Sequence, residues 1–177
     1  MIQALTVAGI PIPSRNPWFL AAIGIHVLGG ITATVVGAIA MLSAKGPGRH
    51  PRSGTIYFWA LIVVTLTMAA LALARWPRDN ALAVLGVLSL ASVLVGRTAR
   101  RRRWPRWRPA HICGMGLSYV LMLTAFYVDN GPHLPLWNRL PTLAFWLLPG
   151  SVGLPLIVYA LWKDGEHRRP GSRARLP

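Results

Sequence analysis

The sequence predicts an all-α integral membrane protein, a helical bundle with five transmembrane helices, and three observations support this fold class. Of its 177 residues, 54% are hydrophobic and 13% charged, and the mean hydropathy of +0.46 is far above that of an ordinary soluble domain. Five segments lack any internal Lys, Arg, Asp or Glu and approach the roughly 20 residues that cross a bilayer. The basic residues gather in the loops between these segments.

The five segments form an expected transmembrane domain over residues 18–162. The spans are expected at about 18–42, 55–74, 81–96, 110–128 and 142–162. The third is the shortest, but Arg78 and Arg97 flank it and can extend to the two interfaces. Residues 1–17 are expected to be an extracytoplasmic segment rather than a cleavable signal, since they lack a basic start and Pro11 and Pro13 break their apolar stretch.

The distribution of Lys and Arg predicts the orientation, because basic loops stay in the cytoplasm. One side would hold only Arg15, Arg75, Arg78 and Arg139. The other side would hold Lys45, Arg49, Arg52, Arg97, Arg100, Arg101, Arg102, Arg103, Arg106, Arg108, Lys163, Arg168, Arg169, Arg173 and Arg175. The N-terminus is therefore expected outside, and residues 163–177 are expected to form a disordered, basic cytoplasmic tail of a multi-pass protein in a bacterial cytoplasmic (inner) membrane.

The formal net charge of +15 would suggest a nucleic-acid partner in a soluble protein. The apolar runs between the charges argue against that partner here. The arginine-rich loop at residues 97–108 fits anionic lipid headgroups at the cytoplasmic face instead. The expected partners are therefore the lipid bilayer and, as a further hypothesis, other membrane subunits.

The sequence offers no catalytic residue and no metal site. The single cysteine, Cys113, excludes an intramolecular disulfide and a cysteine-based metal cage. No nucleophile with an adjacent base, no phosphate loop and no HExxH motif is present. Whether the protein is an enzyme stays open, and so do its oligomeric state and any ligand.

The first span carries a histidine and three small residues on one helix face. His26, Gly30, Ala33 and Gly37 follow a spacing of i, i+4, i+7 and i+11. Small residues allow close approach of another helix, so this face is either a packing face or, because an ionisable group lies within a span, a ligand-binding or proton-handling site.

The fourth span carries a similar stripe of polar and sulfur-containing side chains. His111, Met115, Ser118 and Met122 repeat the same spacing, and Asp129 lies five turns after His111 on the same face. The alternatives are again a buried packing face with interfacial ends and a site that handles a ligand or protons.

The fifth span and the loop at residues 44–54 provide two further groups of candidates. Prolines remove backbone donors within a helix, so a kink or a short unwinding that could line a cavity is expected at Pro149, Gly150, Gly153 and Pro155. Positive-inside bias alone explains Lys45 and Arg52 in the loop. Any function of His50 should lie at the cytoplasmic boundary, where it could contact the base of the fourth span.

Histidine ligands could bind haem b if two imidazoles faced each other at similar depth. With a rise of about 1.5 Å per residue, His26 and His111 are roughly 14 Å apart in depth, which disfavours a haem between them. The remaining pairs are His26 with His133 on the outer side and His50 with His111 on the inner side. His50 and His133 are expected in loops, which weakens both pairs.

Three segments together resemble the family known as domain of unknown function 2306, a group of bacterial predicted membrane proteins. They are AKGPGRHPRSGTIYFW, HICGMGLSYVLMLTAFYVDNGPHLPLW and LPGSVGLP, and the resemblance covers about residues 20–160. Pro51 separates His50 from Arg52, which the family pattern places side by side. The resemblance implies a multi-span bacterial membrane protein and no particular activity. The matching residues are Lys45, Gly46, His50, Arg52, Gly54, Tyr57, His111, Gly114, Met115, Ser118, Tyr119, Thr124, Ala125, Phe126, Val128, Asp129, Asn130 and Gly131.

Three functional hypotheses follow from these features. The bundle could enclose a hydrophobic ligand such as a quinone or lipid in a cavity lined by His26, the His111 stripe and the fifth span. It could dock to a larger membrane complex as an accessory subunit. The alternative is a b-type haem redox protein that uses histidine ligands.

Overall fold

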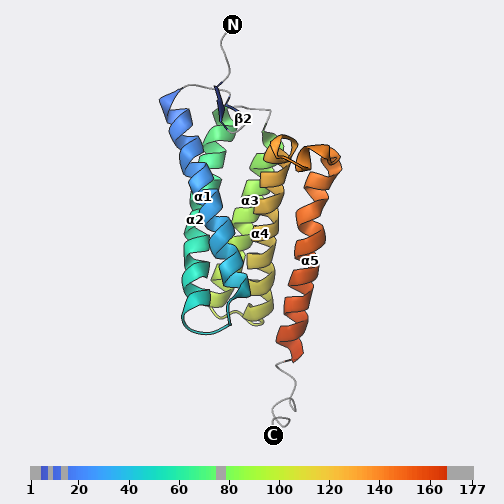
Figure 1. Ribbon diagram of the computed structural model, residues 1–177. Helices are drawn as coiled ribbons and strands as arrows, with labels where there is room; N and C mark the ends of the chain where they lie inside the picture. The colour runs from blue at the N-terminus through green and yellow to red at the C-terminus, as the bar shows by residue number, and fades with distance from the viewer. Residues whose placement is uncertain (1–4, 8–9, 13–15, 75–78, 167–177) are drawn as a thin grey trace.

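The computed structural model describes residues 5–7, 10–12, 16–74 and 79–166, and five long helices account for most of them (Figure 1). The helices are α1 Pro17–Leu42, α2 Arg49–Ala74, α3 Asn80–Arg101, α4 Trp107–Asn130 and α5 Thr142–Glu166. Each is long and apolar enough to cross a membrane. The predicted all-α fold with five transmembrane helices is confirmed.

Several helices extend beyond the apolar spans expected from the sequence. α2 begins at Arg49 rather than at residue 55, and α3 ends at Arg101 rather than at residue 96. α5 continues to Glu166, so the first residues of the expected disordered tail are helical, whereas residues 167–177 lie outside the described part of the chain. Hydropathy reports only the lipid-crossing part of a helix, and helices continue into the polar interface.

The segments that flank α1 and α5 add three kinds of short structure. The strands β1 Leu5–Val7 and β2 Ile10–Ile12 pair antiparallel before α1. The side chain of Asn16 caps α1 by accepting a hydrogen bond from the Trp18 backbone N–H at 3.2 Å. The 3₁₀ turns η1 Gly131–His133 and η2 Trp137–Arg139 connect α4 to α5.

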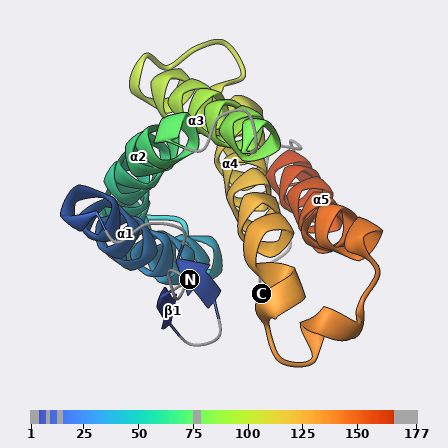
Figure 2. The ribbon, with the colours of Figure 1, turned by 90° about the horizontal axis from the view of Figure 1, so that it is seen from above.

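Helices α1 to α4 form two antiparallel pairs that stand side by side, and α5 lies outside against α4 (Figure 2). The most extensive packing is within the pairs α1–α2 and α3–α4, whereas α2 and α3 share a smaller contact. The α1–α4 contact is narrow and includes a hydrogen bond from the Tyr119 hydroxyl to the Thr34 carbonyl at 3.0 Å. The first four helices therefore consist of two helical hairpins.

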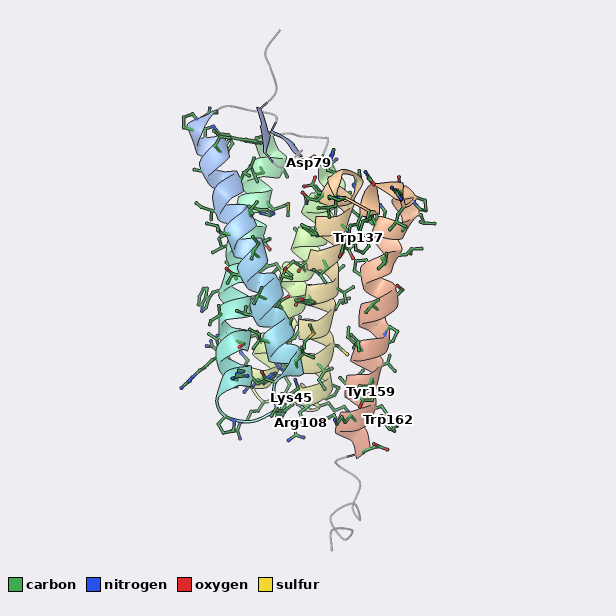
Figure 3. All side chains as sticks on the ribbon, in the orientation of Figure 1. Lys45, Asp79, Arg108, Trp137, Tyr159 and Trp162 are labelled. Carbon is green, nitrogen blue, oxygen red and sulfur yellow. The ribbon has the colours of Figure 1, made fainter. Side chains whose placement is uncertain are left out.

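One end of the bundle gathers the basic residues of the described part of the chain, with the exception of Arg139 in η2. Lys45 and Arg108 lie at the end where α5 finishes, and Asp79 and Trp137 lie at the opposite end (Figure 3). This arrangement agrees with the orientation derived from charge. The expected outer residues Arg15, Arg75 and Arg78 and the tail arginines Arg168, Arg169, Arg173 and Arg175 lie outside the described residues.

The outer surface of the bundle is apolar, as a lipid-facing surface requires. Leu28, Leu73 and Val158 expose 68%, 75% and 63% of their surface, which would be costly in water. The core lies between the first four helices and includes the buried residues Leu61 and Val93. Burial inside and apolar exposure outside fit a bundle that is solvated by lipid.

Helices α3 and α4 approach each other closely at two glycines. A Cβ on Gly114 would lie 2.6 Å from the Gly96 nitrogen and 2.6 Å from the Ser92 carbonyl oxygen. Both neighbouring atoms belong to the backbone, so no side-chain movement could relieve the clash. This contact fixes the base of α4 against the end of α3.

Candidate functional site

His50 belongs to the first turn of α2, which corrects its expected place in a loop. Gly48 precedes the helix with a φ of +107°, a conformation that glycine tolerates best. Pro51 lies in the first turn, where a missing backbone N–H costs nothing because the turn has no carbonyl partner for it. The glycine and the proline therefore start the helix at this point and hold His50 on a rigid element.

The structure brings His50 into contact with His111 at the base of α4. The centroids of the two imidazole rings are 6.5 Å apart, and the ring planes are inclined by 85°. Both rings are half-buried. Of the histidine pairs considered from the sequence, this inner pair is the one that the helices bring into ring contact.

Backbone carbonyl groups orient both rings through the same nitrogen. The Nδ1 of His50 donates to the Ala40 carbonyl at 2.8 Å, and the Nδ1 of His111 donates to the Gly96 carbonyl at 2.9 Å. A carbonyl oxygen can only accept, so Nδ1 carries the hydrogen in each ring. In a neutral ring, Nε2 then keeps its lone pair and can bind a metal or accept a proton.

Positive charge surrounds the histidine pair. Lys45 and Arg100 lie close enough to interact electrostatically with both rings. The ammonium of Lys45 donates to the carbonyls of Ala40 and Met41 at 3.1 and 2.8 Å, and partial burial lowers the pKa of this lysine. Arg52, the third candidate at this boundary, is exposed on α2.

A buried hydrogen-bond network lies deeper in the bundle, between α2, α3 and α4. Ser118 donates to the Met115 carbonyl at 2.8 Å, so its oxygen accepts from the Tyr57 hydroxyl at 2.9 Å. Ser89 donates to the Ser118 carbonyl at 2.8 Å. Ser118 and Met115 therefore belong to the packing of the core below the histidine pair.

His26 lies apart from the histidine pair and is turned toward α2. Its Nδ1 donates to the Val64 carbonyl at 3.1 Å and to the Thr67 hydroxyl at 3.0 Å. Asp129, which is exposed near the end of α4, interacts with it electrostatically. His133 is exposed in η1.

The small residues of the His26 face serve helix packing. Ala33 is fully buried. A Cβ on Gly37 would lie 2.6 Å from the Tyr119 ring and 3.1 Å from the Tyr57 ring. By contrast, a Cβ on Gly30 would meet nothing within 4 Å, so the close packing is confined to the inner half of this face.

The candidates on α5 lie on the other side of α4 from His26. Pro149 is buried and Pro155 exposed, and the helix runs through both without an unwound segment, so the expected unwinding is not observed. Gly153 packs against the Val120 side chain, and nothing lies within 4 Å of a Cβ on Gly150. The structure therefore does not bring His26, His111 and the α5 prolines together around one site.

The sequence reasoning missed several residues that build the site. The carbonyl of Gly96 orients His111, Ala40 orients His50, and Ser89 ties α3 to α4. Ser89 and Gly96 are spaced i and i+7 within an otherwise apolar helix, which is a signal for a packed face. The contact of His50 with the Ala40 carbonyl could not be predicted from the sequence, because every residue has a backbone carbonyl group.

The donor set at the inner end limits the chemistry that the site can perform. No group of three or more His, Cys, Asp or Glu side chains able to hold a metal occurs within the described ranges. The pair therefore offers two imidazole nitrogens and a cationic surrounding. Such a set suits a ligand that brings negative charge and needs only two donors.

Comparisons of the chain with protein-family models, with curated proteins and with solved structures find no match. The resemblance to the family of domain of unknown function 2306 stays a prediction.

Proposed function

We propose that the protein is a b-type haem protein of a bacterial cytoplasmic membrane, with His50 and His111 as the two axial ligands of one haem at the cytoplasmic end of the bundle. The observation that carries this proposal is the contact of the two rings, whose centroids lie 6.5 Å apart with perpendicular planes. His50 and His111 lie near the first residues of α2 and α4, which begin at the same end of the bundle, so they lie at a similar depth, as axial ligation requires.

The distance between the rings fits two ligands of one metal. A metal–imidazole bond is about 2.0 Å long and the ring centre lies about 1.2 Å behind the nitrogen, so opposing ligands have ring centres roughly 6.4 Å apart. The observed separation is 6.5 Å. Perpendicular ring planes are compatible with this geometry, since each ring can rotate about its metal–nitrogen bond.

The number of protein ligands and their charge favour haem over a bare metal ion. A bare zinc ion needs about four donors, whereas porphyrin supplies four nitrogens and leaves two axial positions for the protein. Lys45 and Arg100 would repel a bare cation and pair with the carboxylates of haem. Gly54 lies one turn after His50 on the same face of α2. A Cβ on this glycine would meet nothing within 4 Å, so the backbone beside His50 is open to a bound group.

The proposed ligation implies electron transfer rather than binding of oxygen. Haem iron changes its oxidation state by one electron, and imidazoles on both faces leave no open position for a gas or substrate. The chain would hold the rings through Ala40 and Gly96 and neutralise the carboxylates. Among the described residues we find no site of comparable definition for the quinone, lipid and accessory-subunit hypotheses.

Absorption spectroscopy of the purified protein tests the proposal. The protein should be expressed with a haem supplement and purified in mild detergent. A Soret band and a pyridine haemochrome spectrum of haem b are expected for the natural sequence. His50→Ala and His111→Ala should each remove most of this absorbance, because each loses one axial bond.

Two histidines of the same chain provide matched controls. His26→Ala and His133→Ala remove an imidazole outside the inner pair and should keep the full Soret band. The proposal is wrong if the natural protein shows no Soret band under haem-replete expression. It is also wrong if the band survives in a His50→Ala, His111→Ala double variant.

A further inference from the structure

We infer that the turn between α3 and α4 is a binding site for the phosphate groups of anionic phospholipids. The turn comprises residues 102–106, and its side chains are exposed. It lies at the basic end of the bundle, at the level where lipid headgroups meet a transmembrane protein. The inference does not depend on haem binding.

The backbone of the turn places arginines where the conformation favours glycine. Arg103 has a φ of 48° and Arg106 a φ of 59°, both in the left-handed region. The N–H of Trp104 donates to the Ala99 carbonyl at 3.2 Å, so Arg103 occupies the position after a helix end that is usually glycine. Arginine at both positions indicates that the side chains, rather than the turn geometry, are required.

Topology alone does not explain these two arginines. The positive-inside rule needs basic residues in the loop but not at particular positions, and Arg100, Arg101 and Arg102 already provide them. A left-handed residue directs its side chain differently from its helical neighbours, so Arg103 and Arg106 spread the cationic groups around the turn. The backbone strain is then the cost of this arrangement.

The surroundings match a lipid headgroup. Arg108 pairs with Asp164 at 3.3 Å, whereas Arg103 and Arg106 form no ion pair with any described carboxylate. A guanidinium can donate two parallel hydrogen bonds to one phosphate. Trp104 lies between the two arginines and is 40% exposed, and tryptophan prefers the headgroup level.

Thermal unfolding in lipid nanodiscs tests the inference. The melting temperature of the natural protein should rise when phosphatidylglycerol replaces part of the phosphatidylcholine. The double variant Arg103→Gly, Arg106→Gly should lose about half or more of that rise. In phosphatidylcholine alone it should unfold at the same temperature or higher, because glycine relieves the left-handed strain.

Two further variants keep the test decisive. Arg139→Gly removes an exposed arginine at the opposite end and should retain the full phosphatidylglycerol response. Arg103→Gln, Arg106→Gln removes the charges without adding a flexible glycine and should lose the response as well. The inference fails if both double variants respond to phosphatidylglycerol as the natural protein does, or if the natural protein does not respond.

Discussion

The inner end and the outer half of the bundle use histidine in different ways, although His26, His50 and His111 are all anchored through Nδ1. At the inner end, His50 and His111 donate through Nδ1 to backbone carbonyls, and their ring centroids lie 6.5 Å apart. In the outer half, His26 donates through Nδ1 to Val64 and Thr67 of α2. An anchored ring is therefore not by itself a functional signal, because a polar group in a membrane span needs partners in any case.

The difference lies in what surrounds each ring. The inner rings contact each other edge-on and lie beside Lys45 and Arg100. His26 has only the exposed carboxylate of Asp129 within electrostatic range among the described charged groups. We therefore interpret the inner pair as the ligand site and His26 mainly as a contact between α1 and α2.

The largest expected effect comes from separating α3 and α4 at the inner end. Gly114→Val places a side chain against the backbone of Gly96 and Ser92, so the helices must move apart at a cost of about 3 kcal/mol or more. His111 would then lose its position against the Gly96 carbonyl. Thermal unfolding in detergent and haem content should both decrease.

Gly30→Ala provides the control for this substitution. It adds a smaller group in α1, where nothing lies within 4 Å, and alanine favours a helix over glycine by up to about 1 kcal/mol. Stability should stay the same or rise, with unchanged haem content. A Gly114→Val protein as stable as the natural one would contradict the close α3–α4 packing.

A smaller effect should distinguish the two kinds of histidine directly. His26→Ala and His111→Ala each remove one anchored ring, so each should lower the free energy of unfolding by about 1–2 kcal/mol. Only His111→Ala should lower the haem content. Denaturant titration followed by spectroscopy of the same samples measures both quantities, and equal loss of haem in the two variants would remove the distinction between the two ends.

The smallest effect concerns the pH dependence that Lys45 contributes. Its pKa is lowered in the folded protein, so between the folded and unfolded pKa values the unfolded chain binds more protons and stability rises with pH. Lys45→Met should lack this rise. The side chain is largely exposed, so the difference should stay below about 0.5 kcal/mol.

Unfolding of the natural protein and of Lys45→Met, compared at several values between pH 8 and about 11, isolates this contribution. The natural protein should gain stability relative to Lys45→Met as the pH rises. A natural protein that instead loses stability relative to the variant would contradict the lowered pKa of Lys45.

The sequence alone predicted the five helices and the gathering of basic residues at one end, because lipid solvation imposes long apolar runs and charge bias on the chain. It placed His50 in a loop, since the hydropathy of residues 49–54 is too low for a span. The helix starts there because of Gly48 and Pro51, which is a capping signal rather than a hydropathy signal.

The pairing of His50 with His111 depends on how the helices rotate about their axes. That rotation is set by contacts such as Gly96 with Gly114 and Ser89 with the Ser118 carbonyl. Helical spacing identifies which residues share a face, but it does not say which faces meet. For the same reason, the spacing grouped His26, the His111 stripe and α5 around one cavity, whereas α4 lies between His26 and α5.

The division of the bundle into two hairpins has a consequence for its assembly. His50 belongs to the α1–α2 hairpin and His111 to the α3–α4 hairpin, and α2 and α3 share only a modest contact. A group held by both imidazoles would thus act as a cross-link between two preformed halves. Its binding free energy would be added to their docking, so the apo protein should be the form in which the halves separate most easily.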